Sequence, residues 1–431
     1  MRQIQIKKRS LPEWSALILF LLPFVYSFLT EFLKLPNVIK FASDLLIIIP
    51  LFVVLYNSFS INRFHVKKIN SWLIGVVVVF FLYVLIGYLL NYKSIFYLLW
   101  GVRNNFRFYF AFFVFLFFVV EEDAKKFLDV VDYLFWIHLA VTIIQYFVFG
   151  YEQDYLGGIF GVQKGCNGYV IAFICIVITR SLLLYMNSQE GTFYCFIKCG
   201  TALFLAALAE LKVFLLFFLL IVVISVMTTD FSKKKLVLIV ISIPMIALAY
   251  LFLVSLFDYF EGFLSIDYLL NELLRENYSS SEDLGRFTSV PTICERFLTT
   301  TFDRLVGMGI GNCDTSAISI FNTDFYDRYV DIHYSVFSIS FIFLETGFIG
   351  LVLFISFFIV CLVQSIRALR QKRGNVLFNQ MGIVMSILCF VLMFYNSSLR
   401  TEAGYMIYFV LALPFIGLNN SEHIHATAFD I

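Results

Sequence analysis

Twelve apolar stretches constrain the fold of this chain more than any other feature of its sequence. They cover residues 11–30, 38–57, 72–90, 95–120, 127–149, 168–186, 193–210, 212–228, 236–257, 334–361, 377–396 and 404–419. A helix of roughly 20 apolar residues crosses a bilayer, and these stretches are long enough to do so. Hydrophobic residues make up 61% of the chain and charged residues 14%, too few to cover a soluble globule. The sequence therefore predicts an all-α polytopic membrane protein with about 12 transmembrane helices, residues 1–431 forming one integral membrane domain.

Basic residues are concentrated in alternate connections between these stretches. Eighteen of the 31 Lys and Arg residues form six groups: Arg2/Lys7/Lys8/Arg9, Arg63/Lys67/Lys68, Lys125/Lys126, Arg180/Lys198, Lys233/Lys234/Lys235 and Arg367/Arg370/Lys372/Arg373. Because basic loops stay on the cytoplasmic side, both termini are expected in the cytoplasm. The first stretch follows a basic segment, as a signal peptide would, but its length and the lack of a cleavage site favour an uncleaved span. Residues 186–212 can be divided differently, although the later basic groups favour the two spans given above.

The one long polar segment lies between the ninth and tenth stretches. Residues 258–333 contain 13 Asp and Glu but only 5 Lys and Arg. In this topology they form a large loop on the outer side, where chemistry can be presented to a substrate. The net charge of +1 gives no basic field for nucleic acid. Cys294 and Cys313 share this loop, and the sequence does not decide whether they form a disulfide. Cys195 and Cys199 are expected to pack as small hydrophobic residues.

Two arginines interrupt the fourth apolar stretch. Arg103 and Arg107 are four residues apart, so both side chains lie on one face of the predicted helix. Each arginine at bilayer depth costs roughly 2.5–3.5 kcal/mol and needs compensation. A phosphate clamp explains the pair, because the planar guanidinium group binds phosphate with two parallel hydrogen bonds. Snorkelling to the interface and pairing with an acidic side chain are the structural alternatives.

Two outer connections carry further candidates. Glu210 and Lys212 form either a short hairpin turn or, through Lys212, an addition to the cationic site. Residues 155–168 include Gly157-Gly158-Ile159-Phe160-Gly161 and Asn167, a glycine-rich loop that suits either a lid over the outer surface or an ordinary tight connection.

The end of the large loop holds an ordered set of polar residues and glycines. Arg286 is followed by Gly307-Met308-Gly309-Ile310-Gly311, then by His333, and then by Glu345-Thr346-Gly347-Phe348-Ile349-Gly350 in the tenth stretch. Of the five histidines, only His333 is expected at the outer interface. The order and placement of these residues resemble the O-antigen polymerase and O-antigen ligase family of membrane glycosyltransferases. The loop at 157–161, Asn167 and the basic residue before the eighth stretch, Lys212, add to this resemblance.

The resemblance implies a polymerase of surface polysaccharide repeat units in the bacterial cytoplasmic membrane, with its active site facing the periplasm. The substrate would be an oligosaccharide on undecaprenyl pyrophosphate, with the lipid bilayer and a chain-length regulator as further partners. His333 would act as the general base and Arg286 as a catalytic cation. Arg103, Arg107, Lys212 and Arg400 would bind the pyrophosphate, and Glu345, Gly307, Gly309 and Gly311 would support the site. No cofactor or metal is implied, because cations replace a divalent ion and the outer segments lack an Asp-x-Asp motif.

Three other functions stay open at this stage. A ligase would use the same parts and transfer the glycan to lipid A core, but the acidic loop lacks basic residues to bind phosphorylated core sugars. A flippase for lipid-linked sugar would also hold pyrophosphate with arginines, yet it would need charged residues along a route through both halves of the membrane. A structural membrane subunit would not need paired arginines within a span.

Overall fold

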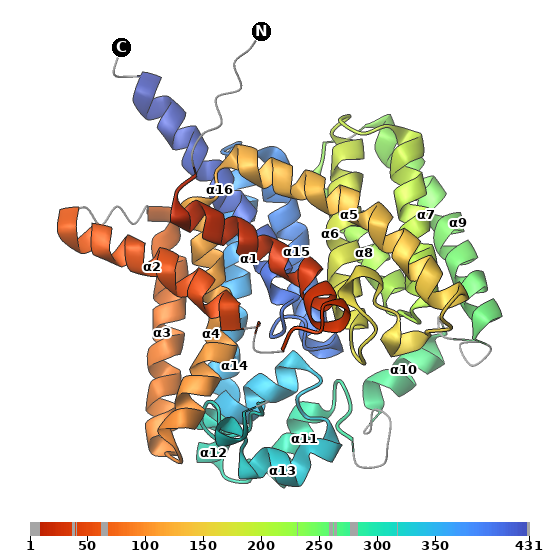
Figure 1. The fold of residues 1–431 in the computed structure, drawn as a ribbon. Coiled ribbons are helices and arrows are strands. Elements are labelled where there is room, and N and C mark those ends of the chain that lie inside the picture. The colour runs from red at the N-terminus through yellow and green to blue at the C-terminus, as the bar shows by residue number, and fades with distance from the viewer. Residues whose placement is uncertain are drawn as a thin grey trace.

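A computed structural model describes residues 9–36, 39, 41–61, 68–230, 232–257, 262, 265–275, 283–316 and 318–428. This part of the chain is helical and contains no β-strand (Figure 1). Its long helices are α1 (Leu11–Ser27), α2 (Ala42–Ile61), α3 (Lys68–Leu90), α4 (Ile95–Phe118), α5 (Glu121–Phe147), α6 (Asn167–Met186), α7 (Thr192–Leu208), α8 (Phe214–Thr228), α9 (Lys233–Leu256), α14 (Ser338–Arg370), α15 (Val376–Tyr395) and α16 (Gly404–Ala428). Each of the twelve predicted stretches overlaps one of these helices.

Seven of the described helices are long and apolar enough to cross a membrane. They are α1 with the π-helical turn that follows it, α3, α5, α6, α9, α14 and α15. Helix α4 carries Arg103, Asn104, Asn105 and Arg107 and falls outside this group. The prediction of a helical membrane protein is therefore confirmed, whereas the number of twelve crossings stays a prediction.

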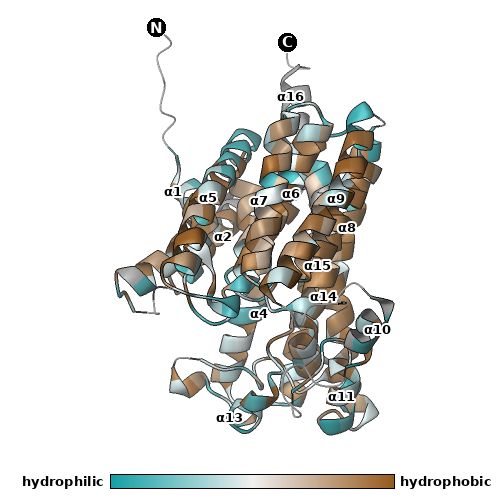
Figure 2. Cartoon of the chain, turned by 90° about the vertical axis from the view of Figure 1, so that its right-hand side faces the viewer, coloured by the Kyte–Doolittle hydropathy of each residue, from teal (hydrophilic) through white to brown (hydrophobic). Residues whose placement is uncertain are grey.

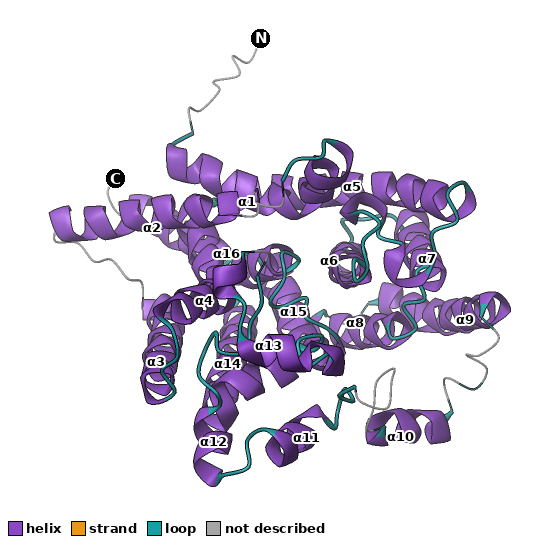
Figure 3. Cartoon of the chain, turned by 60° about the horizontal axis from the view of Figure 1, so that its bottom comes forward, coloured by secondary structure: helices purple, strands orange, loops and turns teal. Residues whose placement is uncertain are grey.

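The helices surround α6, which is the most buried of the seven. Helix α6 packs against α5, α7, α8 and α15, and Figure 3 shows it standing among them. Residues 187–191 and 209–213 separate α6, α7 and α8, so the division predicted within 186–212 is confirmed. Figure 2 shows hydrophobic residues along the middle of the long helices and more hydrophilic residues toward α10–α13. Apolar side chains thus hold the bundle together and also cover its outside.

Residues of the predicted large loop form a layer of short helices at one end of the bundle. These are α10 (Ile266–Leu274), α11 (Ser289–Arg296), α12 (Thr301–Val306) and α13 (Asp324–Tyr329), which lie at the bottom of Figure 1. The turn between α6 and α7 lies at the opposite end. Cys294 and Cys313 are both free thiols, so the disulfide that the sequence left open does not form.

Candidate functional site

Helix α14 is broken at Gly347, and the glycine segment Gly307–Gly311 fills the break. Gly347 has φ +64° and ψ −167°, so the helical hydrogen bonds stop there. The carbonyl oxygens of Leu344 and Glu345 accept instead from the backbone N–H groups of Met308 and Gly309, each at 2.9 Å. A Cβ on Gly307 would lie 2.5 Å from the Gly347 nitrogen, so only glycine permits this approach. The glycines singled out from the sequence therefore bring the large loop into the helical bundle.

Glu345 anchors the far end of the glycine segment. Its side chain is fully buried, and Oε1 accepts from the backbone N–H groups of Gly311 at 2.9 Å and Cys313 at 3.2 Å. The Asn105 amide on α4 donates to Oε2 at 3.4 Å. These hydrogen bonds come from backbone and amide groups. Glu345 thus joins α4, α14 and the glycine segment.

Arg103 and Arg107 both have acidic partners. Nε of Arg103 lies 2.8 Å from Asp44 Oδ2 on α2, and Nη1 of Arg107 lies 3.3 Å from Glu402 Oε1 in the connection between α15 and α16. Glu402 Oε2 also accepts from the Tyr169 hydroxyl at 2.8 Å. The structural alternative of acidic pairing is therefore present, and it supplies the compensation that two buried cations need.

Arg400 completes a cluster of three guanidinium groups. Its backbone carbonyl accepts from Nη2 of Arg107 at 3.3 Å, and its own guanidinium carbon lies 3.2 Å from the centre of the Phe341 ring. Burial lowers the pKa of Arg400 to about 10, and the nearby carboxylates of Asp314 and Glu345 oppose this shift. Arg400 therefore stays charged at neutral pH. We call Arg103, Arg107 and Arg400, with Asp44, Asp314, Glu345 and Glu402, the arginine site.

Several donors in the arginine site are buried without a hydrogen-bond acceptor. They are Nη2 of Arg103, Nε of Arg107, Nε of Arg400 and the nearby amide nitrogen of Asn396. A buried donor without an acceptor costs about 1–3 kcal/mol, and more when it is charged. Asp44 and Glu402 pair with Arg103 and Arg107 and orient them, while these edges have no hydrogen-bond acceptor among the described residues.

His333 forms a dyad with Asp283, a residue that the sequence analysis did not single out. Nδ1 of His333 lies 2.9 Å from Asp283 Oδ1, and the carboxylate side chain is fully buried while the imidazole is about half exposed at 48%. His333 has a left-handed backbone, with φ +53°. With Asp283 ionised, Nδ1 carries the proton and the Nε2 lone pair is left to accept another. A buried acid that orients an accessible histidine is the arrangement a general base requires.

Arg286 and Arg400 both contact aromatic rings at the start of α14. The Arg286 guanidinium carbon lies 4.9 Å from the Tyr395 ring centre and 6.0 Å from that of Phe337. Phe337 is four residues before Phe341, the ring beneath Arg400, so the two cations lie at neighbouring positions along this segment. Asp283 of the dyad is three residues before Arg286, and His333 is four residues before Phe337. The dyad and the two cations therefore all belong to the segments that meet at the start of α14.

Lys212 is placed elsewhere by its contacts. Its Nζ lies 3.1 Å from the hydroxyl of Tyr268 on α10 and 5.7 Å from the centre of that ring. These contacts join the α7–α8 turn to the loop layer. The structure therefore gives no geometric reason to count Lys212 among the residues of the arginine site.

The glycine-rich loop at 157–161 is held by the membrane helices beneath it. Gln145 on α5 donates to the Gly158 carbonyl at 2.9 Å and accepts from the Gly158 N–H at 2.7 Å. Glu31 on the opposite side accepts from the Val162 N–H at 3.2 Å. Fixed from both sides, this loop has the contacts of a structural connection, and Tyr169 just beyond it reaches Glu402.

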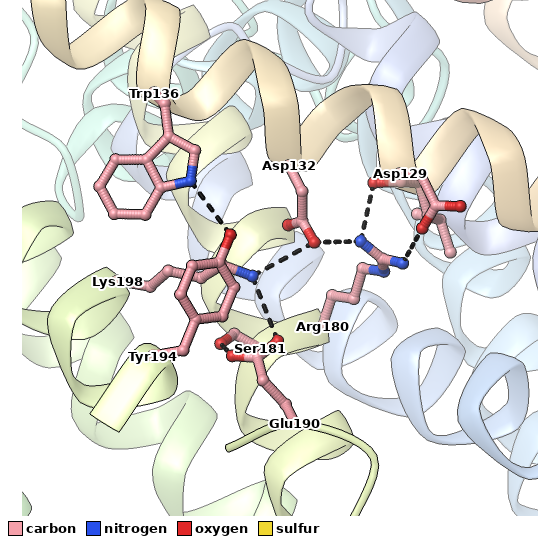
Figure 4. Close-up of polar contacts among 9 residues, drawn as sticks. Asp129, Asp132, Trp136, Arg180, Ser181, Glu190, Tyr194 and Lys198 are labelled. Carbon is pink, nitrogen blue, oxygen red and sulfur yellow. Dashed lines mark hydrogen bonds and ion pairs between the residues drawn. The ribbon is translucent and has the colours of Figure 1, made fainter. Parts of the chain in front are cut away.

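A second group of buried charges lies at the other end of α6. Lys198 on α7 is fully buried and lies 3.2 Å from both Asp132 and Glu190 (Figure 4). Arg180 on α6 pairs with Asp132 and, at 2.5 Å, with Asp129. We call these five residues the α5–α7 ion network. Arg180 and Lys198 were predicted to lie in a cytoplasmic connection; they lie instead within α6 and α7, where Asp132 on α5 pairs with both. The side of the membrane on which they lie stays a prediction.

Comparison with known proteins finds neither a family model nor a curated protein that matches this chain.

Proposed function

We propose that the chain is a membrane glycosyltransferase that polymerises lipid-linked saccharide repeat units. The observation that supports the proposal is the Asp283–His333 dyad together with the guanidinium groups of Arg286 and Arg400, which pack on aromatic rings at the start of α14, and of Arg107, which contacts Arg400. Transfer from a saccharyl pyrophosphate needs a base for the incoming hydroxyl and positive charge for the departing diphosphate. This end of the bundle offers both kinds of group.

In the proposed reaction, Nε2 of His333 takes the proton of an acceptor sugar hydroxyl. The hydroxyl oxygen attacks the anomeric carbon, a new glycosidic bond forms, and the bond from that carbon to the pyrophosphate oxygen breaks. The electron pair stays on undecaprenyl pyrophosphate, whose added charge is stabilised by the unused guanidinium edges. Direct attack opposite the leaving group inverts the anomeric centre. Asp283 orients the imidazole and stabilises it once it is protonated.

The acidic residues of the arginine site have two effects on this reaction. Without substrate they offset the cost of holding three cations in a site that is largely shielded from water. With substrate their carboxylates repel the diphosphate. Attraction by the guanidinium groups and repulsion by the carboxylates together make binding of the diphosphate product weak. The same guanidinium groups stabilise the negative charge that develops in the transition state, so the enzyme can release its carrier lipid after transfer.

The α5–α7 ion network favours a second candidate, a flippase for the same lipid-linked sugar. A flippase needs charged groups in both halves of the membrane, and charged side chains lie near both ends of α6. However, every residue from Val170 to Ile178 on α6 is apolar and at most 3% exposed. The Phe24 ring packs on Phe173 within this stretch, and Phe20 and Phe409 pack on each other beside it. This apolar layer separates the two charged groups over about 16 Å of helix rise, from Tyr169 to Arg180, which favours transfer over transport.

Deletion of the gene, followed by gel analysis of surface polysaccharide, tests the proposal. A polymerase deletion loses the long ladder and keeps a single repeat unit. Unattached long polymer would indicate a ligase, and repeat units trapped on the inner leaflet would indicate a flippase. Re-expression of His333→Ala or Arg286→Ala should leave the ladder absent at normal protein levels. Arg296→Ala is the matched control, because Arg296 is exposed at the end of α11 and outside the site; a wild-type ladder from the His333 variant would refute the proposed base.

A further inference from the structure

A cavity of about 450 Å³ opens beside the first residues of the glycine segment. The turn between α3 and α4 forms one wall with Asn91, Tyr92 and Lys93, and Phe297 and Asp303 from the loop layer form the other. Gly307 and Met308 close its base. The cavity therefore lies between the helical bundle and the layer of short helices, at the same end as the His333 dyad.

The walls combine exposed aromatic rings with charged and amide groups. The Tyr92 side chain is 62% exposed, and its ring makes only an edge contact with Tyr88, with the centroids 5.7 Å apart. Phe297 is held in place by edge contacts with the rings of Phe325 and Tyr329. A pyranose ring presents a face of C–H bonds and a rim of hydroxyl groups. The aromatic rings offer faces that pack against the C–H face of the sugar. Lys93, Asp303 and Asn91 supply hydrogen-bond donors and acceptors for its hydroxyl groups.

The glycine segment links this cavity to the proposed transfer site. Gly307 and Met308 line the cavity, while Gly311 at the other end of the segment is bound by Glu345. Lys93 lies two residues before the start of α4, and Arg103 lies eight residues beyond the first residue of that helix, about 12 Å along its axis. A short oligosaccharide can span this interval.

We propose that the cavity is a saccharide subsite that holds sugar units of the glycan next to the transfer site. This inference rests on the proposed function for the identity of the glycan, but its binding test does not. The volume is within the range of small-molecule binding sites and fits a few sugar units. An occupied subsite keeps a chain near the dyad between transfers, so it should raise the length of the product.

A binding measurement on the full-length protein in lipid nanodiscs tests the subsite directly. The probe is oligosaccharide of one to three repeat units, released by mild acid from the surface polysaccharide of the source cells. We expect Tyr92→Ala to weaken binding about 2- to 12-fold, as the loss of one aromatic contact predicts, and Tyr92→Phe to stay near wild type. Lys93→Ala provides a second variant on an exposed side chain. Tyr133→Ala on α5 is the control, because Tyr133 is 73% exposed and away from the cavity.

The polysaccharide ladder separates the failure of this inference from the failure of the proposed function. If both hold, Tyr92→Ala and Lys93→Ala shorten the ladder while His333→Ala removes it. Unchanged oligosaccharide binding in both cavity variants would overturn the subsite, whatever the His333 variant does. Binding of inorganic pyrophosphate but not of oligosaccharide, lost in Lys93→Ala, would also overturn it. A wild-type ladder from His333→Ala, together with weaker saccharide binding in Tyr92→Ala, would instead reject the transferase and keep the saccharide site.

Discussion

Replacement of Glu345 by alanine should release the glycine segment from α14. The change removes the acceptor of the Gly311 and Cys313 N–H groups and leaves both donors buried. A buried donor left without an acceptor costs about 1–3 kcal/mol, so the loss of both hydrogen bonds should cost about 2–6 kcal/mol. Local opening of residues 307–313 should then become about 30 to 10⁴ times more frequent.

Hydrogen exchange measured by mass spectrometry on the purified protein in nanodiscs reports this opening. Peptides from residues 301–316 should exchange faster in Glu345→Ala, while peptides from α6 should not change. Glu345→Gln is the matched control. It keeps one oxygen acceptor, and its new amide can donate to Asn105 Oδ1, which is buried without a donor in the wild type. Equal exchange of 301–316 in wild type and Glu345→Ala would refute the anchoring role.

Three other substitutions test separate parts of the structure. Asp283→Asn should lower the rate of transfer about 10²- to 10⁴-fold at normal expression, because an amide donor at Nδ1 moves the imidazole proton to Nε2; a rate within fivefold of wild type would contradict the dyad. Gly307→Ala should abolish the ladder and expose residues 301–316 to protease, since φ is +76° there and its Cβ would meet Gly347; normal protease resistance would count against the close packing. Lys198→Met should destabilise the protein by about 3–5 kcal/mol in denaturant unfolding, because Asp132 and Glu190 lose their buried partner; an unchanged midpoint would show that the α5–α7 ion network adds no stability.

The lengths of the apolar stretches located the helices, because every helix that crosses a bilayer needs about the same minimum number of apolar residues. The predicted helix boundaries are wrong where a helix has a charged end. Helix α5 begins at Glu121, whereas the predicted apolar stretch begins at residue 127. Its first turn holds Glu121, Glu122 and Asp123, which favour a helix N-terminus but read as a polar loop in a hydropathy pattern. Helix boundaries at such places depend on the helix dipole, not on hydrophobicity.

The polar partners could not be predicted from the sequence, because they come from distant segments. Asp283 is 50 residues from His333, and Glu402 is 295 residues from Arg107. No spacing rule connects such pairs, whereas the four-residue spacing of Arg103 and Arg107 is a local helical property. The role of Lys212 in the cationic site stays a prediction: it rests on the position of this residue before an apolar stretch, and the structure adds a contact with Tyr268 that no spacing could predict.

The break in α14 has a consequence for how the chain assembles during synthesis. Two carbonyl groups of α14 depend on Met308 and Gly309, each of which precedes its partner in the chain by 36 residues and is therefore synthesised first. Left facing lipid, each of these carbonyls would cost several kcal/mol. The short helices outside the bundle must therefore be in place as the last three long helices settle, so a break in the chain between residues 316 and 338 should trap an incomplete bundle instead of two halves that associate freely.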